Sequence, residues 1–276
     1  MKKFLLIGHP LEHSYSPQIH TIAYKSNNIE ATYALREINP KNFYAEILSL
    51  KKEKIDGFNV TIPYKSKIIP YLDQIDAQAK IVGAVNTVEV INGKWHGFNT
   101  DIAGFLTPLK DLANDIQHCL VLGNGGAARA VVFAILNQIK PEKMIIAGRN
   151  IQRVKNLKNE LCKSMNFQNM EAFSLIDISE KISNLDLIIN TTSLGMSPKI
   201  NESPLPDDFA LKPGAIIYDL IYNPDQTKLL KDAKKNQKEC YVINGKKMLV
   251  AQAVEAIKIW TGKKISIENI LSRINI

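Results

Sequence analysis

Short apolar runs alternate along this chain with longer segments whose apolar residues recur at helical spacing. The first hundred residues predict strands at 3–8, 32–37, 57–61, 84–90 and 94–98, and helices at 16–27 and 42–51. Asn92-Gly93, between the last two strands, predicts a type I′ hairpin. Ser16 followed by Pro17 predicts a helix N-cap and first helical residue, and Asp101 is predicted to cap a helix that ends near Leu112.

From residue 118 the alternation becomes regular. Strands are predicted at 118–122, 143–147, 185–190, 215–219 and 239–243, with helices between most of them, which indicates a parallel, doubly wound sheet. Two further helices, at 247–260 and 266–272, exceed what such a sheet needs and are expected to pack on the first domain. The predicted fold is therefore α/β. A doubly wound Rossmann-type domain occupies 103–245, and a second α/β domain at 1–102 is completed by the C-terminal helices of 246–276.

A glycine cluster follows the strand predicted at 118–122, and a helical segment begins at once after it. Gly123, Gly125 and Ala128 match the G-x-G-x-x-G/A dinucleotide fingerprint in the strand–turn–helix context that it requires. The first glycine allows the tight turn, the second the close approach of a pyrophosphate, and the alanine the packing of helix on strand. Taken alone, the stretch is equally compatible with an ordinary glycine-rich turn.

Arg149 indicates which dinucleotide would bind. NAD-binding folds place an acidic residue after the second strand to bond the ribose 2′-hydroxyl, and here that strand runs into Gly148-Arg149-Asn150, with Arg153 a turn later. A guanidinium group suits a 2′-phosphate by charge and by its forked geometry. We therefore expect NADP, the alternative being that these are solvated basic residues at a helix start.

Composition excludes several classes of function. The net charge of +8 comes from scattered lysines without a nucleic-acid-binding motif, so we expect anionic small molecules as ligands and no nucleic acid. No apolar run is long enough to span a membrane. The three cysteines fit neither a disulfide framework nor a zinc site and indicate a reducing cytoplasm. His9, His13 and His20 lack metal-ligand spacing, so no metal is expected.

Seven motifs, in one order along the chain, resemble those of the shikimate dehydrogenase family. They lie at 8–17 (GHPLEHSYSP), 59–65 (NVTIPYK), 83–87 (GAVNT), 97–104 (GFNTDIAG), 190–196 (NTTSLGM), 219–224 (DLIYNP) and 245–252 (GKKMLVAQ). The resemblance covers nearly the whole chain. It implies reversible, NADPH-dependent reduction of 3-dehydroshikimate to shikimate, a step in chorismate and aromatic amino-acid biosynthesis, with the active site in the cleft between the two domains.

The resemblance also implies roles for particular residues. Lys65 and Asp101 would be the proton-handling, catalytic pair and would also contact the substrate. Ser14, Ser16 and Tyr222 would hold the substrate carboxylate, while Thr61, Asn86 and Gln252 would join Asp101 in holding its hydroxyls. The implied cofactor contacts are Gly123, Asn124, Gly125, Gly126, Ala127, Gly148, Arg149, Asn150, Arg153, Leu220 and Gly245.

Three cofactor positions depart from the family pattern. The family usually shows G-A-G-G-A and N-R-T, whereas this chain has Asn124 for the alanine, Gly148 for the asparagine and Asn150 for the threonine. Gly148 offers no side-chain amide, so contacts to the adenosine ribose and its phosphate are expected to be weaker. The preference for NADP over NAD is accordingly expected to be less steep than in typical members.

Two other functions remain as alternatives. A dual quinate/shikimate dehydrogenase using NAD(P) would tend to carry an acidic residue after the second strand, and none stands here. A non-catalytic NADP-dependent sensor would be expected to lose Lys65 and Asp101, and both are present. We expect a monomer or homodimer acting on a small molecule.

Overall fold

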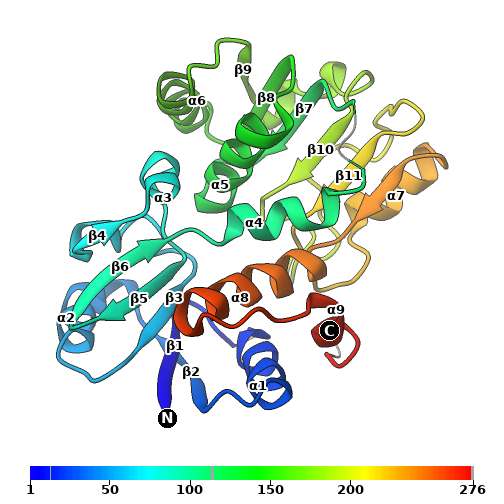
Figure 1. The fold of residues 1–276 in the computed structure, drawn as a ribbon. Coiled ribbons are helices and arrows are strands. Elements are labelled where there is room, and N and C mark those ends of the chain that lie inside the picture. The colour runs from blue at the N-terminus through cyan, green and yellow to red at the C-terminus, as the bar shows by residue number, and fades with distance from the viewer. Residues whose placement is uncertain (13, 113–114, 275–276) are drawn as a thin grey trace. The chain divides into compact units, whose positions relative to one another are not determined.

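The computed structural model describes residues 1–12, 14–112 and 115–274. The described chain forms two compact units: Met1–Gly104 together with residues 250–274, and Phe105–Leu249 (Figure 1). Each unit is built on its own six-stranded sheet and has its own helices. The fold is α/β, as the sequence predicted.

The first unit contains a mixed sheet with the strand order β2-β1-β3-β5-β6-β4. Its strands are β1 (Lys2–Gly8), β2 (Ala31–Glu37), β3 (Gly57–Val60), β4 (Gln74–Ile75), β5 (Thr87–Ile91) and β6 (Lys94–Phe98). Strand β1 pairs in parallel with β2 and β3, while β5 pairs antiparallel with β3 and β6. Asn92 and Gly93 connect β5 to β6 with φ values of 51° and 76°, which confirms the predicted hairpin.

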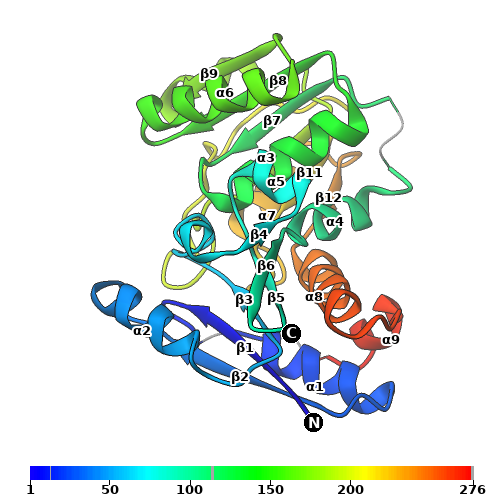
Figure 2. The same cartoon turned by 60° about the vertical axis from the view of Figure 1, so that its left-hand side comes forward.

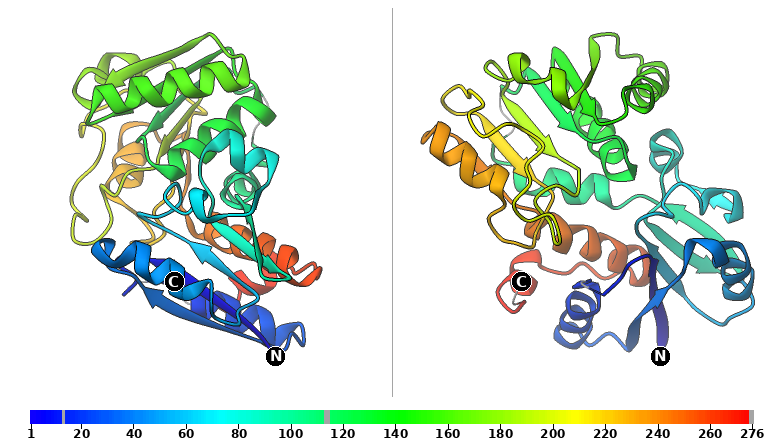
Figure 3. Two further views of the ribbon diagram at one scale, coloured as in Figure 1. Left: turned by 90° about the vertical axis from the view of Figure 1, so that its left-hand side faces the viewer. Right: turned by 180° about the vertical axis from the view of Figure 1, so that it is seen from behind.

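Helices α1 (Ser16–Ser26), α2 (Phe43–Leu50), α3 (Ala77–Val82) and α4 (Asp101–Leu106) belong to this part of the chain. Figure 3 shows α1 beside the β1–β2 pair. The predicted Ser16 cap is wrong by one residue, because the carbonyl of Tyr15 accepts the first helical bond from Ile19 and Tyr15 is the N-cap. The helix predicted to reach Leu112 ends earlier, at Leu106, and Thr107–Leu109 forms a 3₁₀ turn. Pro108 explains this end, since it has no N–H to donate.

The second unit contains a fully parallel sheet with the order β12-β11-β10-β7-β8-β9. The strands are β7 (His118–Leu122), β8 (Lys143–Gly148), β9 (Met170–Ser174), β10 (Leu187–Asn190), β11 (Ile216–Asp219) and β12 (Tyr241–Ile243). The chain moves outward from β7 in one direction and from β10 in the other, so right-handed crossovers place helices on both faces. This is the predicted doubly wound sheet, and its switch point lies between β7 and β10.

Helices α5 (Gly126–Ala134), α6 (Ile151–Met165) and α7 (Lys228–Asn236) cover this sheet (Figure 2). Helix α5 continues as a π-helical stretch, Ile135–Ile139. The core between sheet and helices is mainly aliphatic and includes Leu122, Ile145 and Ile188. Buried apolar residues on every central strand therefore account for the continuous hydrophobic runs that predicted them.

Helices α8 (Lys246–Thr261) and α9 (Ile267–Leu271) bring the C-terminal segment onto the first unit, as predicted. The Trp260 ring stacks on Phe4 with centroids 4.3 Å apart, and its Nε1 donates to the carbonyl oxygen of Val88 at 3.0 Å. The Nζ of Lys2 donates to the carbonyl oxygen of Trp260 at 2.6 Å. One buried tryptophan thus joins α8 to two strands of the first sheet.

Candidate active site

A lysine and an aspartate form a close, shielded ion pair in the first unit. The Nζ of Lys65 lies 2.6 Å from Oδ2 of Asp101, and the two side chains are only 16% and 6% exposed. Lys65 lies in the turn after β3, where its carbonyl oxygen accepts from the N–H of Val85 at 2.7 Å. Asp101 opens α4, so two elements 36 residues apart supply the pair. An ammonium group held in this way is suited to donate a proton to a reacting oxygen.

Asn86 holds the other oxygen of the Asp101 carboxylate. Its Nδ2 donates to Oδ1 of Asp101 at 2.8 Å and to Oγ1 of Thr100 at 2.9 Å, while its Oδ1 accepts from the N–H of Thr100 at 2.7 Å. Both amide hydrogens of Asn86 are thus engaged within the protein. Asn86 therefore orients the carboxylate that orients Lys65.

Further buried polar residues, which the sequence did not identify, support this cluster. The Nδ2 of Asn59 donates to the carbonyl oxygen of Asn86 at 3.1 Å and to Oγ1 of Thr87 at 3.0 Å. Its Oδ1 accepts from the Tyr33 hydroxyl at 2.8 Å. Asn59 lies in β3, all of whose residues are buried. A polar residue inside such a short apolar strand could have indicated a buried hydrogen-bond network.

The remaining predicted substrate contacts lie at the start of α1, after β3, on α8 and after β11. Ser14 and Ser16 are half-buried at the start of α1, where Oγ of Ser14 accepts from the N–H of Ser16 at 3.3 Å. Thr61 follows β3 directly, and Gln252 lies half-buried on α8. Tyr222 belongs to the second unit, just after β11, and is half-buried. His13, part of the first motif, lies outside the described residues.

The glycine turn of the second unit fits a pyrophosphate. Gly123 has a φ of 121°, and a side chain there would collide with Oγ1 of Thr191. A Cβ added at Gly125, by contrast, would meet no atom within 4 Å. Among the described residues no side chain caps α5, which starts at Gly126. Open space beside the uncapped N–H groups of a helix is what a bound phosphate requires.

Two exposed guanidinium groups stand at the end of β8. Arg149 and Arg153 flank the start of α6, and the side chain of Asn150 caps that helix by accepting from the N–H of Arg153 at 3.0 Å. No acidic residue lies among residues 148–155. The local charge therefore favours an anionic group at this strand end.

A buried carboxylate ties together the ends of β10 and β11. Asp219 accepts from Nδ2 of Asn190 at 3.0 Å, from the N–H of Ile221 at 3.1 Å and from Oγ1 of Thr227 at 2.6 Å. The next residue, Leu220, packs closely on Gly245, where an added Cβ would overlap the Leu220 carbonyl oxygen. Asp219 was not among the predicted site residues, although its motif was recognised. Asp219 holds the N–H of Ile221, whose carbonyl oxygen accepts from the N–H of Gly245 at 2.9 Å, so it supports the backbone beside Leu220 and Gly245, two predicted cofactor contacts.

Burial raises the pKa of Asp219 to about 6, against the opposing effect of its three hydrogen bonds. A carboxyl group whose pKa is higher in the folded state contributes stability below about pH 4, and that contribution is lost as the pH rises through 6. The shift from 3.8 to about 6 corresponds to about 3 kcal/mol. Urea denaturation at several pH values should therefore show the stability of the wild type falling by about this amount relative to Asp219→Asn between pH 4 and 7. A difference that does not change with pH would contradict the assignment.

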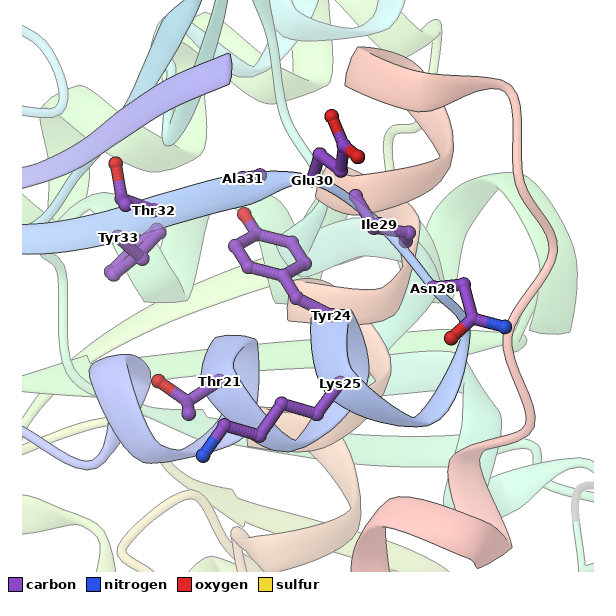
Figure 4. A pocket seen from close by; sticks show the side chains of 9 residues that line it. All are labelled: Thr21, Tyr24, Lys25, Asn28, Ile29, Glu30, Ala31, Thr32 and Tyr33. Atoms are coloured by element: carbon purple, nitrogen blue, oxygen red, sulfur yellow. The ribbon is translucent and has the colours of Figure 1, made fainter. Parts of the chain in front are cut away.

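A hollow of about 560 Å³ lies between the second half of α1 and the start of β2, lined by residues such as Tyr24, Lys25 and Glu30 (Figure 4). None of the predicted site residues lines it.

Within the described part of the chain, no helix is long and apolar enough to cross a membrane, and no group of three or more His, Cys, Asp or Glu could hold a metal ion. Cys119, Cys162 and Cys240 are free thiols.

Three family comparisons match successive parts of the chain. Residues 6–88 match the shikimate dehydrogenase substrate binding domain, and residues 109–203 match the shikimate / quinate 5-dehydrogenase family. Residues 247–274 match the shikimate 5′-dehydrogenase C-terminal domain.

Similar proteins agree with these matches over nearly the whole length of the chain. The NADP⁺ shikimate dehydrogenase of Methanococcus maripaludis strain C6 is 41% identical over 261 residues, which cover 94% of this chain and 91% of that protein. A crystal structure of a shikimate dehydrogenase in complex with NADP⁺ superposes with a TM-score of 0.89 at 37% identity, covering 100% of this chain and 96% of the other. The Thermus thermophilus enzyme, crystallised with NADP(H) and shikimate, gives a TM-score of 0.84 at 32% identity and covers 99% and 98% of the two chains.

Proposed function

Because the chain belongs to the shikimate dehydrogenase family, we propose that it reversibly reduces 3-dehydroshikimate to shikimate with NADPH, in the biosynthesis of chorismate and the aromatic amino acids. The observation that supports this most directly is the shielded Lys65–Asp101 pair. A sensor without catalytic activity would not need such a pair. The substrate is a small carboxylic acid, and the cofactor is NADP.

Lys65 is the proton donor in this proposal. NADPH, when bound, supplies a hydride to the carbonyl carbon, and the C=O electron pair moves onto oxygen. The Lys65 ammonium group polarises that oxygen and gives it a proton, and in the oxidative direction the lysine takes the proton back. Asp101 contacts the substrate hydroxyls and orients Lys65, while Asn86 keeps the carboxylate in place.

Ser14 and Ser16 hold the substrate carboxylate at the start of α1. Their hydroxyls donate to an anion, and the N-terminus of an 11-residue helix favours negative charge. Tyr222 joins this group, and Thr61 and Gln252 contact ring hydroxyls. Each of these roles follows from the family motifs together with the half-buried position of the side chain.

Residues at the carboxyl ends of the second sheet's strands would hold NADP. The pyrophosphate would be held at the N-terminus of α5, by Gly123, Asn124, Gly125, Gly126 and Ala127. The adenosine ribose and its phosphate would be held by residues at the start of α6, namely Gly148, Arg149, Asn150 and Arg153. Leu220 and Gly245, which pack on each other beside the Asp219 network, would contact the nicotinamide.

A spectrophotometric assay tests this function and separates it from the quinate alternative. With NADP⁺ we expect NADPH formation from shikimate at a kcat/KM about 10²-fold above that for quinate, because quinate adds a hydroxyl beside the carboxylate that the paired serines do not accommodate. Quinate turned over at a rate comparable to shikimate would favour a dual-specificity enzyme. Inactivity with both acids would refute the proposal.

We place the enzyme in a reducing cytoplasm as a monomer or homodimer. The support for the compartment is that Cys119, Cys162 and Cys240 are all free thiols.

A further inference from the structure

The side chain of Asn124 reaches from one strand end to the next. Asn124 follows Gly123 in the turn after β7, and it is half-buried. Its Oδ1 and Cγ lie 3.7 and 3.8 Å from the position that a Cβ on Gly148 would occupy at the end of β8. Since β7 and β8 are paired neighbours, with Leu122 opposite Ala147, the amide of the glycine turn lies beside the residue that precedes Arg149.

The packing around position 148 leaves no room for a side chain. A Cβ there would lie 2.8 Å from Cγ2 of Val154, a fully buried residue of α6. Val154 therefore closes the site from the helix side, while Asn124 covers the same glycine from the turn side. The family pattern has an asparagine at position 148, where this chain has a glycine. Asn124 places an amide at the same strand end instead.

This strand end is where a doubly wound nucleotide fold distinguishes the substituent on the adenosine 2′-oxygen. The surrounding charge is positive, from exposed Arg149 and Arg153. The Asn150 side-chain oxygen is already engaged in capping α6. Asn124 thus adds a neutral side-chain amide on the turn side of a site that also holds two cationic side chains.

We propose that Asn124 is a specificity residue for NADP⁺, whose Nδ2 donates to the 2′-phosphate beside Arg149. This inference rests on the proposed placement of NADP on the glycine turn. The sequence predicts a weaker preference for NADP over NAD because Gly148 has no side-chain amide. If Asn124 supplies an amide instead, the preference should be as strong as in typical family members.

Binding of 2′,5′-ADP and of 5′-ADP to the full-length protein, measured by isothermal titration calorimetry, tests the proposal without catalysis. The two probes differ in the phosphate on the 2′-oxygen and in the length of the 5′ chain, so each variant is compared with the wild type for one probe at a time. Asn124→Ala should weaken 2′,5′-ADP binding about tenfold, as for a lost hydrogen bond to a charged group, and change 5′-ADP binding less than threefold. Asn124→Asp is isosteric but anionic and should weaken 2′,5′-ADP binding by about 10²-fold.

Asn156→Asp is the matched control, because it makes the same charge change at an exposed position on α6. It should leave binding of both probes within about twofold of the wild type, since exposed charges are largely screened. Equal melting temperatures of the variants would exclude a general loss of folding.

The outcomes separate the inference from the function on which it rests. If the wild type binds 2′,5′-ADP and Asn124→Ala binds it equally well, the role of Asn124 is wrong and the cofactor site stands. If Asn124→Ala weakens both probes by the same factor, Asn124 only shapes the turn, and the specificity role is wrong. A wild type that binds neither 2′,5′-ADP nor NADP⁺ would refute the cofactor site itself.

Discussion

Replacing Lys65 by alanine is expected to lower kcat for shikimate oxidation by about 10³-fold while changing KM only a few-fold. Nζ of Lys65 acts on the oxygen at which charge develops, so most of its contribution arises in the transition state. Steady-state kinetics with NADP⁺ saturating give both parameters. Lys67→Ala removes the same charge from an exposed neighbouring position and should leave kcat within about twofold of the wild type.

Replacing Asp101, the ion-pair partner of Lys65, tests whether the two residues act together. Asp101→Asn keeps the shape of the side chain but removes the charge that holds Nζ of Lys65 at 2.6 Å. If the two residues act as a unit, the double variant should be little slower than Lys65→Ala alone. Multiplicative losses would show that Asp101 acts on the substrate independently of the lysine. Near-normal turnover in Lys65→Ala would remove the lysine from the mechanism altogether.

Hydrophobic runs predicted β3 and the central strands of the second sheet because nearly all of their residues are buried. They missed β9 (Met170–Ser174), an edge strand whose Glu171 pairs with Lys143 at 2.8 Å. A strand at an edge needs no continuous apolar run, and polar residues protect it from pairing with other chains. The two-residue strand β4 and the short helix α3 were also missed, since segments of that length carry too little periodic pattern.

The sequence predicted which residues form the catalytic pair but not all of the hydrogen bonds around it. The motifs identified Lys65 and Asp101, which the structure brings together as an ion pair. The sequence assigned Asn86 to a substrate hydroxyl, which stays a prediction, and it did not indicate that the Asn86 amide also donates to Asp101 and Thr100. Local sequence carries no signal for such contacts, because they depend on how β3, the β5–β6 hairpin and α4 pack.

Asp219 illustrates the same limit in the second unit. The sequence placed it at the end of a strand within a recognised motif, but its importance lies in the three groups that it accepts from. Two of these, Asn190 and Thr227, lie 29 and 8 residues away along the chain. Its raised pKa follows from burial, which strand prediction alone does not measure.

Replacing Arg149 by alanine is expected to lower kcat/KM for NADP⁺ by about 10²-fold and to leave the value for NAD⁺ within a few-fold of the wild type. The reason is that a forked guanidinium group makes paired, charge-assisted hydrogen bonds to a phosphate, whereas NAD⁺ presents a neutral hydroxyl at the same place. Initial rates with each cofactor, at saturating shikimate, measure the effect.

Lys155→Ala is the control for this variant, because it also removes one positive charge from the exposed side of α6. A general electrostatic attraction of NADP⁺ would be lost about equally in both variants and would weaken with salt. A specific contact should be lost in Arg149→Ala alone and persist at higher ionic strength. A wild type that prefers NAD⁺, or an Arg149→Ala variant impaired equally with both cofactors, would show that Arg149 does not distinguish them, and the absence of an acidic residue after β8 would then need another explanation.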